Sequence, residues 1–257
     1  MVALVNMFMK KLVRAGYNIF ISGGTNSGKT TFLNAVTGYE KADASISIGD
    51  LDVYKNYELM KHMIAFAPQQ DLLRNDDSVY NTLKNAAQMR LPIDTSPEQA
   101  EEEIRRMLDI FGLADMKNSF IGTLSGGQRK RASIAVEFIS NPVLFFLDEP
   151  DSGLDGVMAR SLMEDLRKIT GNSKIIVVIS HAPDRVIDLF DDVIVLAKDA
   201  DRTGRLAFYG PVEEARKFFG KDTMEGIIST INRKEEGGEG RADEFISRFE
   251  EVRNAEQ

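Results

Sequence analysis

Residues 19–36, IFISGGTNSGKTTFLNAV, are the stretch that decides the fold of this chain. The apolar run Ile19 to Ser22 has the character of a short strand, Gly23 to Thr30 satisfies the pattern G-x-x-x-x-G-K-[ST], and a helical segment follows. In this setting the glycines let successive backbone N–H groups turn inward around phosphates. Lys29 adds a positive charge, and Thr30 adds a hydroxyl for magnesium. The stretch therefore predicts a phosphate-binding loop; an ordinary glycine turn between buried elements is the alternative.

A second apolar run ends in two carboxylates. Val143 to Leu147 reads VLFFL, without alternation, which fits a parallel strand buried on both faces. Carboxylates at the C-terminal end of such a strand sit where open α/β sheets bind ligands. Phosphoryl transfer demands mainly positioning and charge neutralisation, so one carboxylate per task is enough. We expect Asp148 to hold magnesium, usually through water, and Glu149 to orient and deprotonate the attacking water. An acidic pair that merely ends a strand is the alternative.

The segment Leu124 to Gln128, LSGGQ, lies between these two motifs. Ser125 and the two glycines after it precede residues 128–139, which have helical composition, so Ser125 is the expected N-cap. The exposed N–H groups and the dipole at a helix start favour an anion. We therefore expect an anion site here; a helix start with a tight turn and no ligand is the alternative.

Five motifs stand in one order along the chain. They are the loop at Gly23 to Thr30, Ala67-Pro68-Gln69, LSGGQRKRASIA from Leu124 to Ala135, FFLDEPDSGLD from Phe145 to Asp155, and Ile179-Ser180-His181. Through them the chain, from Gly16 to Phe219, resembles the nucleotide-binding domain of an ABC ATPase, most of all those of the G subfamily of ABC transporters. The resemblance implies an α/β fold: a P-loop NTPase (RecA-like) parallel sheet core with an ABC-type helical subdomain and a small antiparallel β region.

The resemblance also implies the ligands, ATP and Mg²⁺, and the residues that bind them. ATP would be contacted by Gly23, Gly24, Thr25, Asn26, Ser27, Gly28, Lys29, Thr30, Thr31, Ser125, Gly126, Gly127, Gln128 and Asp155. Magnesium would be held by Thr30, Gln69 and Asp148, and the catalytic residues would be Glu149, His181 and Gln69. His181 would sense the γ-phosphate rather than transfer the proton. Gln69, favoured over the adjacent Gln70 by the alignment through Pro68, would sit at the hinge of the helical insert.

In this family the anion at Ser125 would be the γ-phosphate bound to the opposite subunit. Two such domains would pack head to tail around two ATP molecules, as a homodimer or with a different ABC nucleotide-binding domain. A transmembrane domain, in the same or another chain, would be the further partner, which implies the cytoplasmic side of a membrane. The implied function is ATP hydrolysis coupled to substrate transport. A soluble non-transport ABC-class ATPase acting on a macromolecular complex is the alternative, and a non-catalytic nucleotide-gated interaction module is a third reading.

Composition is in keeping with these expectations. The 257 residues are enough to bury a core as one domain with a subdomain. The formal net charge of -8 argues against a nucleic-acid partner. The absence of cysteine excludes disulfides. No apolar stretch of the sequence approaches the ~18 residues that a spanning helix needs, so a membrane role requires another segment or subunit.

We expect three regions along the chain. They are an ATP-binding core of residues 1–70 and 141–220, a helical signature subdomain of residues 71–140, and a C-terminal tail or linker of residues 221–257. Core strands are expected around Phe20, Phe66, Phe145, Val177 and Ile194, and strands of the small antiparallel region at Ala44 to Ile48 and Arg205 to Tyr209. Helices are expected at Val79 to Arg90, at Pro97 to Phe111 behind an N-cap at Ser96, and, within the tail, at Asp243 to Val252.

The N-terminus departs from the pattern of the family. ABC domains carry an aromatic residue on a strand well upstream of the phosphate loop, whereas only 22 residues precede Gly23 here. Val2 to Val13 reads as a helix, and this stretch with the loop is also similar to hexameric secretion ATPases of the pilus-assembly type. Phe8 and Tyr17 are candidates for stacking on the base, although each fits a core position. Either the parent polypeptide extends further upstream or this chain binds the base differently. We therefore expect modest base selectivity, and we expect His62 to be structural.

Overall fold

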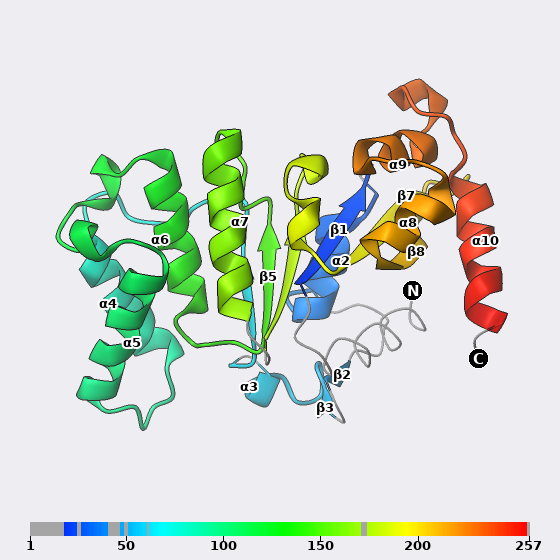
Figure 1. Cartoon of the computed structure of the whole chain (residues 1–257). Coiled ribbons are helices and arrows are strands. Elements are labelled where there is room, and N and C mark those ends of the chain that lie inside the picture. The colour runs from blue at the N-terminus through cyan, green and yellow to red at the C-terminus, as the bar shows by residue number, and fades with distance from the viewer. Residues whose placement is uncertain are drawn as a thin grey trace.

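The computed structural model describes residues 18–24, 27–40, 47–48, 51–60, 62–170 and 174–255. Within these residues one six-stranded sheet has the order β4-β5-β6-β1-β7-β8 (Figure 1). The strands are β1 Asn18–Gly23, β4 Ile64–Ala67, β5 Leu144–Asp148, β6 Ile175–Ile179, β7 Asp192–Lys198 and β8 Gly204–Pro211. The first five are the core strands that the sequence predicts. The α/β class is confirmed.

Three parallel strands carry the functional residues to one edge of the sheet. β5 pairs with β4 and β6, and β6 pairs with β1, all in parallel. Asp148 of β5 and Ile21 of β1 both pair with Ile179 of β6. The C-terminal ends of β1, β5 and β6 therefore lie side by side. This is the edge at which open α/β sheets bind ligands.

Helices on both faces explain why the apolar runs of these strands show no alternation with polar residues. α2, Lys29–Thr37, packs against β1, β4 and β5, and α7, Gly156–Thr170, packs against β6. Figure 1 shows α7 in front of the sheet and α2 behind it. Every residue of β5 and β6 is buried. A strand covered on both sides has no solvent face on which polar residues would alternate.

The antiparallel pairs differ in part from the expectation. The sequence pattern predicts residues 205–209 in a small separate region, but they belong to β8, which pairs antiparallel with β7 at the edge of the main sheet. A tight reversal causes this pairing, because the N–H of Asp199 donates to the Thr203 carbonyl at 2.9 Å and β8 folds directly back. Of the strand expected at residues 44–48, the described part is β2, Ser47–Ile48, which pairs with β3, Leu51–Asp52.

The helical insert lies at the left of the sheet in Figure 1. It contains α4 Val79–Arg90, α5 Pro97–Ile110 and α6 Gly126–Phe138. α4 packs against both α5 and α6, and α6 packs against β4. Each of the three helices begins behind a serine whose hydroxyl accepts a backbone N–H, which satisfies one of the free donors at the helix start. Contact between α6 and β4 attaches the insert to the sheet.

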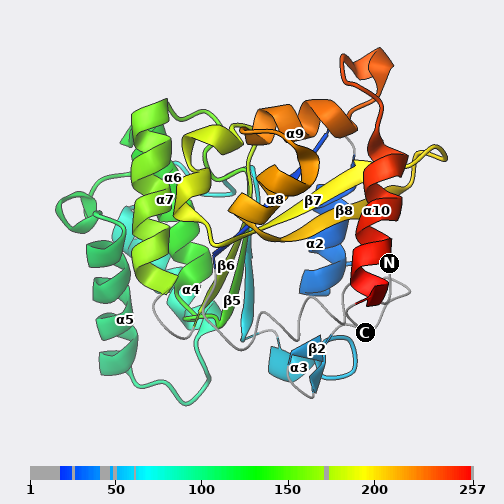
Figure 2. The same cartoon turned by 45° about the vertical axis from the view of Figure 1, so that its right-hand side comes forward.

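The C-terminal residues pack onto the sheet instead of forming the linker that their composition predicts. α8 is Val212–Phe219, α9 is Met224–Ile231 and α10 is Ala242–Ala255, and Figure 2 shows α10 beside β8, which it contacts. Five phenylalanines of β8, α8 and α10 form one cluster: Phe208, Phe218, Phe219, Phe245 and Phe249. The rings of Phe219 and Phe245 are 4.6 Å apart at their centroids. Aromatic burial on this scale outweighs the charged, glycine-rich composition of residues 233–240.

Some expectations fall on residues outside the described part. These are the helix at residues 2–13 and the two aromatic residues proposed to stack on the base, Phe8 and Tyr17. α3 is Tyr57–Met60, and His62 lies exposed in the turn before β4. Among the described helices, none combines the length and the apolar character that crossing a membrane requires.

Candidate functional site

The phosphate loop joins β1 to α2, and its lysine is turned inward. Lys29 is the first residue of α2 and is buried, and its ammonium donates to the carbonyl oxygens of Gly23 at 2.7 Å and Gly24 at 3.0 Å. Burial lowers the pKa of Lys29, while the carboxylates of Glu149 and Asp148 oppose that shift. Phosphate oxygens accept more strongly than backbone carbonyls. The ammonium is therefore held beside the loop where it can bind a phosphate.

Two further features of the loop fit a bound phosphate. Gly28 adopts φ +93°, a conformation that side chains disfavour, and directs the chain into α2. The Ser27 hydroxyl is buried, and the described residues offer it no hydrogen-bond partner. Such an unpaired buried hydroxyl is unfavourable until an acceptor or donor reaches it. Thr31 is exposed on the first turn of α2, and the two remaining loop residues, Thr25 and Asn26, lie outside the described part.

Thr30 and Asp148 meet across the gap between α2 and β5. The Thr30 hydroxyl donates to Asp148 Oδ2 at 3.2 Å. Burial raises the pKa of Asp148, and the neighbouring Glu149 adds to this rise, whereas the Thr30 hydrogen bond opposes it. Within the described residues no group of three or more His, Cys, Asp or Glu side chains could hold a metal. One hydroxyl and one carboxylate fit Mg²⁺, which keeps several waters and takes further ligands from substrate phosphates.

Glu149 is the point at which the three predicted catalytic residues meet. Gln69 Nε2 donates to its Oε2 at 2.6 Å, and His181 Nε2 lies 2.5 Å from its Oε1. The carboxylate is 16% exposed and the imidazole 65%. The backbone of Glu149 adopts φ +48°, which is strained for a residue with a side chain. Its N–H donates to the Ile179 carbonyl at 2.9 Å, which fixes the turn that follows β5.

The signature segment, residues 124–128, forms the start of α6, the signature helix. This helix start is capped within itself and has no described contact with the phosphate loop. Ser125 and Gln128 form a capping box: Gln128 N–H donates to the Ser125 hydroxyl at 3.3 Å, and Ser125 N–H donates to Gln128 Oε1 at 2.9 Å. A Cβ on Gly126 would meet nothing within 4 Å, while one on Gly127 would meet only side chains, Met158 Sδ nearest at 3.2 Å. Among the described residues no hydrogen bond or ion pair joins residues 125–128 to the phosphate loop.

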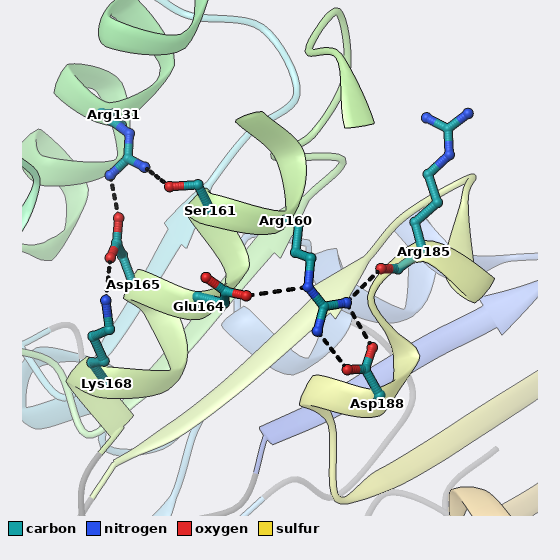
Figure 3. A network of polar contacts seen from close by, with 8 residues as sticks. All are labelled: Arg131, Arg160, Ser161, Glu164, Asp165, Lys168, Arg185 and Asp188. Atoms are coloured by element: carbon teal, nitrogen blue, oxygen red, sulfur yellow. Dashed lines mark hydrogen bonds and ion pairs between the residues drawn. The ribbon is translucent and has the colours of Figure 1, made fainter. Parts of the chain in front are cut away.

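Asp155 caps α7 in the structure. Its Oδ1 accepts the N–H of Val157 at 2.9 Å and of Met158 at 2.8 Å. Farther along α7, Arg160 binds Asp188 at 2.6 Å and the Arg185 carbonyl at 3.1 Å (Figure 3). Residues 185 and 188 lie in the 3₁₀ turns that follow His181. α7 thus connects the Asp155 turn to the segment that carries the histidine.

Two contacts at the site were not predicted from the sequence. Ser180 donates to Asp151 Oδ2 at 2.5 Å, which ties the end of β6 to the turn after Glu149. Asn232, at the end of α9, has its side-chain oxygen against Gly24, where an added Cβ would displace that side chain. The aspartate could have been suspected from its place beside Glu149. Nothing in the local pattern connects Asn232 to a loop more than 200 residues earlier.

The family model described as ABC transporter matches residues 9–152. The chain belongs to the ABC transporter family. This ABC domain is 32% identical over 219 residues to the ABC transporter ATP-binding/permease protein Rv1747 of Mycobacterium tuberculosis, covering 85% of the chain and 25% of that protein. It is 34% identical over 208 residues to ABC transporter G family member 28 of Arabidopsis thaliana, covering 77% and 18%. Matches to several G family members place it in the G subfamily.

Solved structures agree with this assignment. The ABC domain superposes on cbiO1 of Clostridium perfringens, part of the ABC transporter complex cbiONQ, with a TM-score of 0.68 and 25% identity, covering 79% of the chain and 80% of cbiO1. A nucleotide-free ATP-binding cassette from an ABC transporter shares the fold with a TM-score of 0.67 at 22% identity, covering 82% and 87%. The chain is an ATP-binding domain of the ABC ATPase class. It spans only about a quarter or less of the curated relatives named above.

Proposed function

We propose that this domain binds and hydrolyses ATP as one half of a head-to-tail pair and thereby drives substrate transport across a membrane. The second half is another copy or a different ABC nucleotide-binding domain. The pair acts on a transmembrane domain, in the same or another chain, from the cytoplasmic side. The observation that carries the proposal is the Glu149 carboxylate, which Gln69 and His181 both contact beside the Thr30–Asp148 pair.

Glu149 is suited to activate the attacking water. Its two oxygens are oriented by Gln69 and His181, and each oxygen keeps a second lone pair that can accept a proton or a hydrogen bond. Because phosphoryl transfer depends on positioning and on charge neutralisation, a fixed carboxylate meets the main demand on a base. His181 is exposed and contacts the same carboxylate. It could therefore bind the γ-phosphate while it still contacts Glu149. Glu149 is therefore the base, and the other two residues position it.

Magnesium would neutralise charge on the β- and γ-phosphates, held by Thr30, Asp148 and the Gln69 side chain. The hydroxyl and the Asp148 carboxylate already lie 3.2 Å apart. Lys29 supplies the remaining positive charge from the loop side. Lys29, Thr30 and Asp148 would thus be the groups that hold the phosphates and the metal.

The exposed start of α6 supports a paired arrangement. Residues 125–128 present backbone N–H groups at a helix start, yet no described contact links them to the phosphate loop of the same chain. A helix start favours an anion. The γ-phosphate of a second domain would supply that anion, and the two-fold operation would build two equal sites.

A hollow next to Gln69 supports coupling to a membrane partner. It measures about 410 Å³, and its lining includes Leu72, Pro68 and the Arg90–Glu137 ion pair. Leu72 is 84% exposed, three residues after Gln69. An apolar segment of a transmembrane domain seated here would contact Pro68 and Leu72, which stand on either side of Gln69 in the chain.

Complementation of two inactive variants tests the paired site. Lys29→Ala removes the phosphate charge, and Ser125→Glu places a carboxylate where the γ-phosphate would bind. Each variant alone should be inactive, but a mixed pair keeps one complete site. After mixing with ATP, random pairing should restore about a quarter of wild-type turnover, since half of the pairs carry one of two sites. No recovery would rule out sharing of the site between two chains.

The transport part of the proposal requires a separate measurement. Cells of the source should be fractionated and probed with an antibody raised against this domain. The domain is expected in the membrane fraction, either within a polypeptide well above 28.7 kDa, the mass of this chain, or as a 28.7-kDa band bound to a separate membrane chain. A band of 28.7 kDa that stays out of the membrane fraction with ATP present would favour a non-transport ATPase.

A further inference from the structure

The signature helix holds a buried lysine that no predicted role explains. Lys130, on the second turn of α6, is 5% exposed. Its ammonium donates to the carbonyl of Gln69 at 2.8 Å, and it lies 3.5 Å from the carbonyl of Pro68 and 3.4 Å from Asp71 Oδ1. Burying a charge is costly unless its donors are satisfied. Here all three acceptors come from the four residues around Gln69, so the interaction fixes that segment and no other.

Arg129 extends the attachment along the chain. Its guanidinium donates to the Leu73 carbonyl at 3.2 Å and to Asn75 Oδ1 at 2.5 Å. Residues 68–75 are thus held on α6 at both ends. Backbone carbonyls as acceptors make the attachment act on the position of the main chain, whichever rotamer the Gln69 side chain adopts.

The same two elements carry the two halves of the proposed site. From the segment, the Gln69 amide reaches Glu149 at 2.6 Å. From the helix, Ser125 begins the segment that would meet the γ-phosphate of the second domain, five residues before Lys130, or about 7.5 Å along the axis. A helix is stiff over this length, so a shift of the Gln69 backbone is passed to the helix start through Lys130.

We propose that Lys130 is a positioning residue that makes the backbone of Gln69 and the start of the signature helix move as one unit. This inference rests on the proposed function, because it deepens the role of the same site. Binding of Mg-nucleotide beside Glu149 would then move Ser125 toward the partner domain. Loss of Lys130 would leave each half-site intact but uncoupled.

Hydrogen exchange in the whole chain tests the coupling without any turnover. The probe is a non-hydrolysable ATP analogue with Mg²⁺ at saturation. In the wild type it should slow amide exchange in residues 68–75 and in residues 124–131 together. In Lys130→Met the first response should remain and the second should be much weaker, although Arg129 still holds residues 73–75 on α6, while Lys130→Arg should restore it. An unchanged response of residues 124–131 in Lys130→Met would overturn the proposal.

Arg131→Met is the matched control. Arg131 is the next residue on α6, but it contacts α7 through Asp165 at 2.5 Å and Ser161 at 3.0 Å, as Figure 3 shows. The Arg131→Met variant therefore loses an ion pair of α6 but keeps every described contact between α6 and residues 68–75. The exchange response should survive in this variant. Loss in both variants would mean general loosening of α6 and would also overturn the specific role of Lys130.

Turnover supplies the second readout. Lys130→Met should lower kcat about tenfold with little change in KM, a scale typical of lost coupling. Combined with Gln69→Ala it should have no further effect, because Lys130 acts through Gln69. Additive losses in the double variant would contradict this. If the wild type shows the coupled exchange response but no hydrolysis, the proposed function fails and the coupling by Lys130 stands.

Discussion

The edge of the sheet and the start of the signature helix differ in how far one chain completes them. At the edge, residues as distant in sequence as Gln69 and His181 converge on one carboxylate. The signature segment is contiguous, and its polar groups satisfy one another in a local capping box. The catalytic half is thus assembled by the fold, whereas the signature half is only presented by it. Variants at the two places should therefore fail in different ways.

The largest effect is expected at the carboxylate on which the edge converges. Glu149→Gln should lower kcat by about 10²–10³-fold, because an amide cannot take the proton from water. ATP affinity should change little, and paired domains should accumulate in ATP, as size-exclusion chromatography with light scattering would show. Glu164→Gln, on the exposed side of α7, is the control and should behave as wild type. Near-normal turnover of Glu149→Gln would remove Glu149 from the role of base.

A substitution in the phosphate loop should weaken ATP binding, whereas Glu149→Gln should slow hydrolysis. Lys29→Ala removes the ammonium that now contacts Gly23 and Gly24, and a charged hydrogen bond contributes about 1.5–3 kcal/mol. The dissociation constant for Mg-ATP should rise about 10- to 100-fold, measured by isothermal titration calorimetry. Lys168→Ala is the control and should bind Mg-ATP as the wild type does. The Lys168 side chain is exposed and pairs only with Asp165 among the ion pairs described. Equal affinities would mean that Lys29 does not contact the phosphates.

Two capping boxes with the same geometry separate stability from function. Ser96 with Gln99 and Ser125 with Gln128 each satisfy a helix start in the same way. Ser96→Ala and Ser125→Ala should both destabilise the protein by about 1 kcal/mol in urea unfolding. Only Ser125→Ala should also lower ATP turnover, by about tenfold, because only this start is proposed to meet a phosphate. Equal turnover in the two variants would mean that Ser125 only caps the helix and does not meet a phosphate.

The smallest effect concerns Asp148 and depends on pH. Its folded pKa is raised above the ordinary 3.8, so its contribution to stability is fully present below 3.8 and is lost as pH rises through the folded value. Asp148→Asn stays neutral and can still accept from Thr30. Without nucleotide, the variant should be more stable than wild type near pH 7.5, by on the order of 1 kcal/mol. Urea unfolding should show this advantage vanish near pH 3.5; a constant difference would contradict the assigned cause.

Regular elements could be predicted from the sequence where one signal dominated. α4 has the predicted bounds Val79–Arg90, and Gly38 ends α2 with φ +77°. The five core strands appear where continuous apolar runs stand, because burial on both faces leaves a plain pattern. The catalytic trio was predicted through the order of motifs, and the structure brings it together. The roles of these residues stay predictions until they are measured.

Long-range features could not be predicted from local pattern. The tail was expected to be a linker because residues 233–240 are charged and rich in glycine, but the phenylalanines on either side meet those of β8 and α8. Lys130 sits in a basic run, RKR, that suggests a solvated surface. Its burial follows only from the packing of α6 on β4, which places the carbonyl of Gln69 within reach. The contact between Asn232 and Gly24 likewise depends on packing between residues far apart in the sequence.

The left-handed backbone conformation of Glu149 lowers the stability of the fold at a residue that we propose is needed for hydrolysis. A side chain in the left-handed conformation, here φ +48°, carries a penalty of about 1–2 kcal/mol that glycine would escape. The adjacent Asp148 is likewise an unfavourable buried carboxylate. Two consecutive positions thus lower the stability of the fold, and they are the two to which we assign the metal and the base. Selection for thermal stability alone would replace both, and the most stable descendants of this chain should bind ATP without hydrolysing it.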